Sequence, residues 1–431
     1  MNNLTNIILI TIDSLRFDAL DNHLSELDAF SNLIKRGSYF TRAYSSAPYT
    51  VHSMVSLLTG LFSFRLKKVD IGEFDGVTID KELTIASKLK QAGYKTIGIH
   101  SNPFLSNMLG FDKGFDTYLD YFPLRSWPIP RLTKRFLVKL VRLFQKQPYL
   151  IAPEINKRLF NILDKSNSDN PVFLWIHYMD THGPYQSKGN NSYYNKFKAE
   201  ALWHKAIKEP QELTPSDRKT LYNTYLEEIS FLDKNISQLI DGLNHRNLLE
   251  DSLIFITADH GDAFGEHGFY SHPAMLYEEL IRVPLIAIGP QIPQKRVEGL
   301  CSNISIAPTI IEILDMDNQI QFDEKSLLSV INNSGEKYVI SFAEIYPEYH
   351  ASIIKGSWKL IKNYGNDTVE LFNIINDPKE NHNIVKENQK IADELNEILK
   401  KIIENNSNPG SKKIGSIDPS IESRLRDLGY F

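Results

Sequence analysis

Apolar residues along this chain fall into two patterns that alternate with each other. Short unbroken apolar runs, which predict buried strands, lie at 7–12, 96–99, 172–176 and 253–257. Longer segments in which apolar residues recur every three or four positions predict helices between these runs, as at 82–92 and 220–243. Because strands and helices alternate, we expect a three-layer α/β/α sandwich with a mostly parallel central sheet.

The pattern changes near the C-terminus. Short runs at 338–343, 351–354 and 358–362 predict antiparallel strands, and a periodic segment at 388–404 predicts a helix. The sequence therefore predicts two units. The main α/β domain is expected to span residues 1–335, and a small α+β subdomain residues 336–431.

The composition is that of a globular protein and excludes several classes. The 431 residues are 42% hydrophobic and 23% charged, and a formal net charge of −5 predicts no nucleic-acid partner. One cysteine, Cys301, excludes an internal disulfide framework. The sequence shows no secretory signal and no run near the roughly 18 apolar residues of a membrane span, so it predicts a cytoplasmic protein. It leaves the oligomeric state open.

A basic insertion at about 124–161 interrupts the α/β pattern. Within it, residues 131–146 interleave lysine and arginine with leucine, valine and phenylalanine, as in a basic amphipathic helix. Such a helix could contact a membrane surface or an anionic substrate. The favoured interpretation is an ordinary helix with a solvated basic face, or an oligomer contact.

Acidic residues follow the first and the last of the four apolar runs. Asp13 comes directly after the run at 7–12, and Asp259 and His260 follow the run at 253–257. Sites in open α/β sheets form at the carboxyl ends of strands, so these side chains are expected to converge there. Carboxylate and imidazole together indicate a divalent metal site, although Asp13 and Asp259 could instead cap helices.

A third candidate, Thr50, lies between the two acidic strand ends. Pro48 precedes it, and the residues after it have helical spacing, so Thr50 is expected to be the N-cap of a helix. A hydroxyl at a helix N-terminus could also act as a nucleophile, because the amide groups and the helix dipole favour an anion there.

These residues resemble the sulfatase branch of the alkaline phosphatase superfamily. The resemblance covers nearly the whole chain and rests on motifs that occur in the family's order: Asp13, Thr50 before Leu58-Thr59-Gly60, Asp259-His260, Gly265-Glu266-His267-Gly268, Ala307-Pro308-Thr309 and Asn376-Asp377-Pro378. It implies an alkaline phosphatase-like fold, metal ligation by Asp13, Asp259 and His260, and a nucleophile at Thr50.

The chain departs from the sulfatase pattern at positions that recognise the ester. Thr50 stands where sulfatases convert a cysteine to formylglycine, so that aldehyde chemistry is excluded. His52 replaces the motif proline, Asn102 lies in a segment that lacks the family's lysine, and His272 takes the place of a later lysine. Thr50 and His272 instead resemble phosphoethanolamine and phosphoglycerol transferases and some phosphodiesterases of the same superfamily.

The expected mechanism uses one divalent metal ion (Zn, Mn, Mg or Ca) bound by Asp13, Thr50, Asp259 and His260. Thr50 attacks the ester, and His182 is the first candidate for the general acid, with His272 the second. Alternatively, His182 and His272 complete a second metal site. The expected substrate contacts are His52, Asn102, His182 and His272. By contrast, His177 and His100 are expected to be buried and hydrogen-bonded rather than catalytic.

The leading functional prediction is a metal-dependent hydrolase of phosphate (di)esters or related phosphonate or sulfate esters. The alternatives are a transferase that moves a phosphate-linked group to a glycan or lipid acceptor, a sulfatase that works without formylglycine, and a non-enzymatic binding protein. The expected partner is a small-molecule or glycan- or lipid-linked anionic ester. The transferase reading would use the basic segment 131–146 for a peripheral membrane contact.

Overall fold

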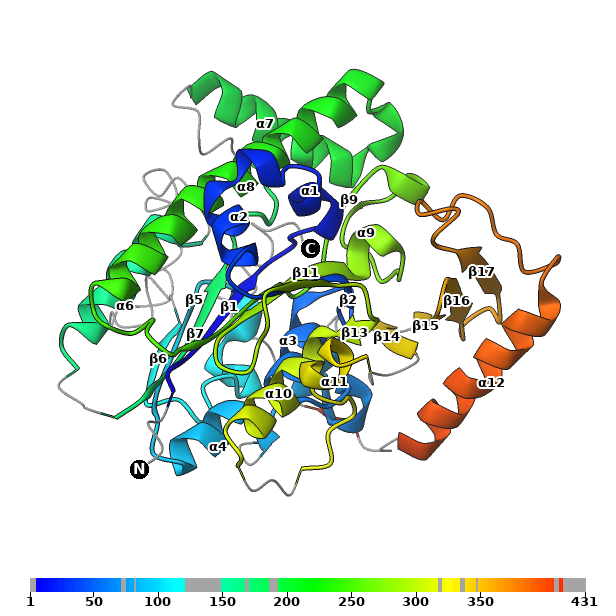
Figure 1. Ribbon diagram of the computed structural model, residues 1–431. Coiled ribbons are helices and arrows are strands. Elements are labelled where there is room, and N and C mark those ends of the chain that lie inside the picture. The colour runs from blue at the N-terminus through cyan, green and yellow to red at the C-terminus, as the bar shows by residue number, and fades with distance from the viewer. Residues whose placement is uncertain are drawn as a thin grey trace.

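The structure is a computed structural model (Figure 1) that describes residues 5–70, 75–80, 83–120, 149–166, 170–185, 193–316, 320–333, 338–345, 348–406 and 411–413. The predicted basic segment 131–146 lies outside these residues. Among the described residues, no helix combines the length and the apolar character needed to cross a membrane.

A nine-stranded sheet forms the centre of the molecule. Its strand order is β12 (Lys295–Val297), β2 (Ser38–Tyr44), β11 (Arg282–Ile288), β8 (Leu253–Ala258), β1 (Ile7–Ile12), β7 (Val172–Tyr178), β5 (Lys95–His100) and β6 (Thr117–Asp120), with β13 (Cys301–Ser302) also paired to β2. All pairs are parallel except those of β11 with β2 and β8. The strands predicted from the four apolar runs all form, and they lie side by side as β8, β1, β7 and β5.

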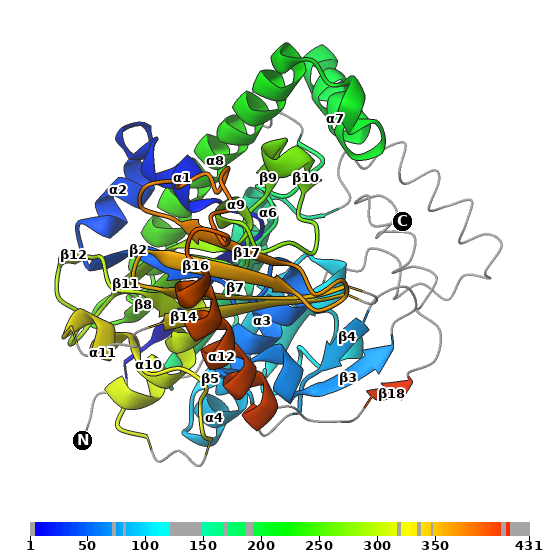
Figure 2. The ribbon, with the colours of Figure 1, turned by 90° about the vertical axis from the view of Figure 1, so that its right-hand side faces the viewer.

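Helices cover both faces of this sheet (Figure 2). Along β1, Ile8, Ile10 and Ile12 pack into one apolar core and Ile7 and Leu9 into another, because successive side chains point to opposite faces. The first core is covered by α1 (Phe17–Asp21), α2 (Asp28–Ile34), α6 (Ala152–Leu163), α7 (Tyr193–Lys208) and α8 (Pro215–Asn244). The second is covered by α3 (Thr50–Thr59), α4 (Ile85–Gln91), α10 (Ile306–Ile313) and α11 (Leu327–Ile331). The predicted three-layer α/β/α sandwich is confirmed.

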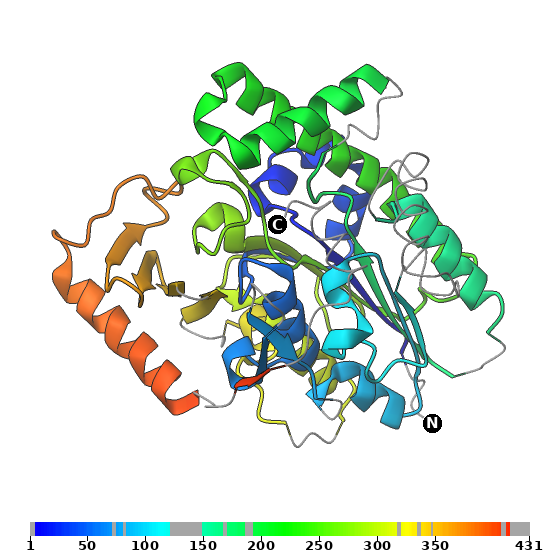
Figure 3. The same cartoon turned by 180° about the vertical axis from the view of Figure 1, so that it is seen from behind.

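A small antiparallel sheet with one long helix follows in the chain. It has the order β14 (Tyr338–Ile345), β15 (Glu348–Lys355), β16 (Trp358–Asn363) and β17 (Val369–Asn373), and α12 (Gln389–Asn406) packs on it through a separate apolar cluster. Seen from behind, the sheet and α12 lie at the side of the molecule away from α6 (Figure 3). The expected α+β character is confirmed, and the division of the chain at residue 335 stays a prediction.

Several element boundaries differ from the sequence prediction. Helix α8 begins at Pro215 rather than residue 220, because Thr214 and Asp217 form a reciprocal capping box there. Helix α4 begins at Ile85 rather than residue 82, since the Thr84 hydroxyl accepts a hydrogen bond from the Ser87 amide.

Short elements complete the described fold. They are the sheet of β3 (Lys67–Asp70), β4 (Asp75–Thr78) and β18 (Ser411–Lys413), the hairpin of β9 (Ala263–Phe264) and β10 (Tyr270–Ser271), and α9 (Glu278–Ile281). The hairpin and α9 follow the carboxyl end of β8, so they lie next to the edge of the sheet where the predicted site residues are found.

Candidate metal centre

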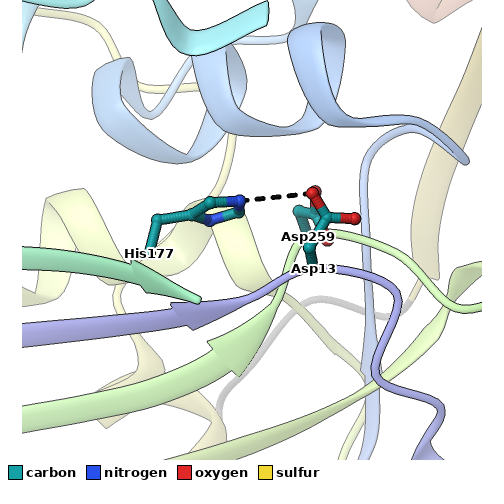
Figure 4. Close-up of side chains that lie close together, drawn as sticks. All are labelled: Asp13, His177 and Asp259. Atoms are coloured by element: carbon teal, nitrogen blue, oxygen red, sulfur yellow. Dashed lines mark hydrogen bonds and ion pairs between the residues drawn. The ribbon is translucent and has the colours of Figure 1, made fainter. Parts of the chain in front are cut away.

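Three buried side chains converge at the carboxyl edge of the central sheet (Figure 4). Asp13 follows β1, His177 is the penultimate residue of β7, and Asp259 follows β8. Since β1 lies between β7 and β8 with parallel pairing on both sides, the three strand ends meet. One ligand atom from each residue lies within 4.8 Å of the other two.

The backbone around the two aspartates is held by hydrogen bonds that cross between strands. The Asp13 amide donates to the Tyr178 carbonyl at 2.8 Å, and the Thr181 hydroxyl donates to the Asp13 carbonyl at 2.5 Å. Ser14 adopts a positive φ of 60°, and its amide donates to Oδ1 of Asp259 at 3.1 Å. These contacts fix the backbone of Asp13 and the carboxylate of Asp259 before any ligand binds.

His260 joins the cluster from the residue after Asp259. Its Nε2 lies 3.7 Å from Oδ1 of Asp13, 3.5 Å from Oδ2 of Asp259 and 3.3 Å from the Thr50 hydroxyl. Its Nδ1 lies 2.8 Å from the Gly261 carbonyl, so the N–H belongs on Nδ1 and the lone pair on Nε2. Burial lowers the pKa of His260 to about 3, which keeps the ring in the neutral form that binds metals.

Thr50 differs in one respect from its prediction. It is the first residue of α3, not the N-cap. The N-cap is Tyr49, whose extended backbone (φ −151°, ψ 155°) precedes the helix. The Thr50 hydroxyl contacts Nε2 of His260 and hydrogen-bonds Asp259. The Ser53 hydroxyl, one turn further along, donates to the Asp259 carbonyl at 2.6 Å and ties α3 to the end of β8.

The electrostatics of the cluster favour a bound cation. Asp13 and Asp259 are both completely buried. Burial and the neighbouring Asp13 carboxylate raise the pKa of Asp259 well above its ordinary value. Burial acts in the same direction on Asp13, but the imidazoles of His182, His177 and His260 outweigh it and hold the pKa of Asp13 below its ordinary value.

A divalent ion would relieve the repulsion between the two carboxylates, and the mixed oxygen and nitrogen donors suit such an ion. The residues present therefore fit a divalent metal.

His177 is buried and hydrogen-bonded, as expected, but the sequence analysis did not place it beside Asp13. It was expected to be a buried, hydrogen-bonded histidine. Its Nδ1 does lie 2.9 Å from the Thr11 hydroxyl, but its Nε2 lies 3.3 Å from Oδ2 of Asp13. The available signal was its position directly after the apolar run 172–176, which corresponds to the position of Asp13 after the run 7–12.

Asn102 contacts a carboxylate of this cluster. Its Nδ2 donates to Oδ2 of Asp13 at 2.8 Å, and its Oδ1 accepts a hydrogen bond from the Phe104 amide at the start of a short 3₁₀ turn. These two contacts orient the Asp13 side chain. His52 lies in the first turn of α3, is buried, and packs edge-on against the Tyr49 ring at 4.7 Å. The expected substrate contacts of Asn102 and His52 stay predictions.

His182 and His272 extend the cluster of imidazoles away from the sheet. The His272 ring stacks on His260, with ring centres 4.6 Å apart, and the His182 ring meets His272 edge-on at 5.1 Å. Nδ1 of His272 lies 2.8 Å from the Ser271 hydroxyl and 3.7 Å from Oδ1 of Asp262. Burial lowers the pKa of His182.

Family models match the greater part of the chain. One described as "Sulfatase" matches residues 5–316, and one described as "N-sulphoglucosamine sulphohydrolase, C-terminal" matches residues 265–407. Among curated relatives, the uncharacterized sulfatase YidJ of Escherichia coli strain K12 is 24% identical over 391 residues. That match covers 82% of this chain and 77% of YidJ.

Solved structures share the fold over nearly their full length. The phosphonate monoester hydrolase of Agrobacterium radiobacter has a TM-score of 0.72 at 15% identity, with 94% of this chain and 96% of that chain covered. Ps i-CgsB, solved in complex with k-i-k-neocarrahexaose, has a TM-score of 0.70 at 20% identity, with 99% and 97% covered. At these identities, the likeness establishes the architecture alone.

Proposed function

This chain belongs to the sulfatase family, and we propose that it is a metal-dependent hydrolase that cleaves phosphate diesters or phosphonate monoesters through Thr50. One observation carries the proposal. The Thr50 hydroxyl lies at the N-terminus of α3, 3.3 Å from Nε2 of His260 and beside the buried Asp259 carboxylate. A nucleophile thus adjoins the residues that fit a divalent ion.

The proposed ligands of that ion are Asp13, Asp259, His260 and Thr50, and the position of His177 makes it a further candidate. Oxygen and nitrogen donors together slightly favour Zn or Mn over Mg or Ca. When bound, the ion would lower the pKa of the Thr50 hydroxyl and neutralise charge on a non-bridging ester oxygen.

The residues around Thr50 supply the remaining chemistry. The first amides of α3 face the anionic group, as at other helix N-termini. The Thr50 hydroxyl releases its proton to solvent, a bond forms between its oxygen and phosphorus, and the bond from phosphorus to the leaving oxygen breaks. The leaving oxygen takes a proton from His272 or His182, whose rings are in contact. Water then cleaves the resulting ester of Thr50, which restores the hydroxyl and releases a phosphate monoester or a phosphonic acid.

The residue type at position 50 decides the substrate class within this proposal. A phosphate diester, a phosphonate monoester and a sulfate monoester each carry one negative charge, so charge alone does not distinguish them. A threonine cannot form the aldehyde hydrate of sulfatases that carry formylglycine at this position. It can form a phosphate ester. A phosphonate monoester hydrolase shares this fold, while Ps i-CgsB suggests that a glycan ester should also be tested.

The test measures turnover of four nitrophenyl or phenyl esters: a phosphate monoester, a phosphate diester, a phosphonate monoester and a sulfate. Wild type, Thr50→Ala and Thr50→Ser are compared with Mn²⁺ or Zn²⁺ present. The surface variant Thr220→Ala, on α8, is the matched control. We expect diester or phosphonate cleavage that is lost in Thr50→Ala, retained in part in Thr50→Ser and unchanged in Thr220→Ala.

Turnover of the sulfate alone would overturn the substrate class. Equal activity of wild type and Thr50→Ala would overturn the nucleophile. Metal binding without turnover of any ester would reject the hydrolase in favour of a transferase.

A further inference from the structure

A second buried cluster of histidine and carboxylates lies outside the candidate metal centre. His267 is in the 3₁₀ turn Glu266–Gly268, Glu279 is in α9, and Glu380 is in the segment after β17. One ligand atom from each lies within 4.8 Å of the other two. The cluster therefore joins the segment that follows β8 to the segment that follows the small sheet.

Two atoms of this cluster that could bind a metal ion lie close together, and neither makes a hydrogen bond within the described residues. Glu279 is 8% exposed, and its Oε1 makes no hydrogen bond within the described part of the chain. Nε2 of His267, 3.9 Å away, is buried and makes none either. Leaving a buried carboxylate oxygen without a donor is costly, and a shared cation is the usual remedy.

Among the described residues, Glu279 forms no ion pair with a lysine or an arginine, whereas two neighbouring carboxylates do. Lys359 is completely buried, with its Nζ 2.8 Å from Glu380 and 3.1 Å from Glu278. Arg282 lies 3.8 Å from Glu278. These two cations therefore balance Glu278 and Glu380, while Glu279 stays without one.

The His267 ring is held in place for ligation. The residue adopts a left-handed backbone with φ of 50°, which is unusual for a residue with a side chain. Its ring stacks on Tyr277, with centres 3.7 Å apart and planes within 7°, and a backbone hydrogen bond joins it to Lys379. Because the ring stacks on Tyr277 and hydrogen-bonds the Lys379 backbone, its Nε2 is held in one position, as in metal-binding histidines.

We propose that His267, Glu279 and Glu380 bind a structural divalent cation of the zinc type, which fastens the segment after β17 to α9. One imidazole nitrogen and two carboxylate oxygens, with water as a fourth ligand, suit Zn²⁺. Glu380 shares its carboxylate between the ion and Lys359. This site uses no residue of the candidate metal centre, so its occupancy and the activity of Thr50 can be measured separately.

The test uses the full chain with the candidate metal centre disabled. In Asp13→Asn/Asp259→Asn, Zn²⁺ binding is measured by calorimetry with ZnCl₂ and by elemental analysis after dialysis. We expect one Zn²⁺ per chain, with affinity lowered at least 10-fold by adding either His267→Ala or Glu279→Gln. His204→Ala, which removes an exposed histidine on α7, should leave binding unchanged.

A second measurement is the thermal stability of the disabled chain with and without Zn²⁺. Zn²⁺ should raise the Tm of the disabled chain, and Glu279→Gln should remove that increase. Glu279→Gln keeps the shape of the side chain, so it remains informative if His267→Ala fails to fold. No Zn²⁺ binding by the disabled chain, or binding that both variants leave intact, would overturn the proposal.

Discussion

The two buried clusters use similar residue types in opposite ways. At the carboxyl edge of the central sheet, the ion-pair partners of Asp13 and Asp259 within the described residues are histidines, and a threonine hydroxyl adjoins them. Between α9 and the segment after β17, a fully buried lysine already pairs with two of the carboxylates. An ammonium group built into the chain stabilises carboxylates permanently, whereas neutral imidazoles leave the charge to an exchangeable ion.

This difference indicates that the first cluster serves ligand binding and the second stabilises the fold. Like-charged carboxylates held together without a built-in cation cost folding free energy, and such local costs concentrate at functional sites. The lysine-containing cluster does the reverse, because its ion pairs stabilise the contact of α9 with the small sheet and the segment that follows it. Substitutions in the two clusters should therefore affect different measurements.

The largest effect is expected from Asp259→Asn. The amide keeps the shape of the side chain, and its oxygen can still accept hydrogen bonds from the Ser14 and His260 amides. The substitution removes one negatively charged metal ligand, so kcat/KM for the best ester should fall by roughly 10³-fold or more. The free energy of unfolding without metal should stay the same or rise, because a repulsive pair is lost. Urea unfolding and steady-state kinetics on the same preparation check both parts. Unchanged kcat/KM would remove Asp259 from the site.

Lys359→Met should give the opposite result. Removing one partner of a buried ion pair leaves carboxylates uncompensated and costs about 3–5 kcal/mol of stability. We expect that loss in urea unfolding, while kcat/KM at a temperature where the variant is folded changes little. Adding Glu380→Gln should restore part of the stability, since one buried charge is then removed. A variant as stable as wild type would show that Lys359 does not stabilise this contact.

The central strands and the acidic strand ends could be predicted because both depend on local sequence. An apolar run forms a buried strand, and the polar residue that follows it must lie at the sheet edge, which placed Asp13 and Asp259 correctly at that edge. The runs did not reveal β2 and β11, where Thr41, Arg42 and Pro284 interrupt the apolar pattern. Thr50 was misplaced by one residue, because the chain stays extended through Tyr49 before it turns into the helix.

Contacts between distant segments were beyond local patterns. The position of β1 between β7 and β8 brings Asp13 to His177, 164 residues away. The local sequence around His177 is the same whether the side chain fills a core or faces a metal ion. Its role could therefore not be predicted without its neighbours in the fold. The second cluster depends even more on topology. Lys359 alternates with apolar residues in β16 as a solvent-facing residue would, yet it is completely buried beneath Glu278 and Glu380.

The smallest expected effect distinguishes two roles for Asn102. If it orients Asp13 through the 2.8 Å hydrogen bond, Asn102→Ala should weaken metal binding by about 10–100-fold, and saturating metal should restore much of the activity. If it contacts the ester instead, metal affinity should stay at the wild-type value while KM rises. Asn303→Ala is the matched control, because the Asn303 side chain donates to the Ala258 carbonyl beside Asp259 without touching its carboxylate. Metal titration and KM measured at saturating metal separate the two roles, and a change in neither would contradict both.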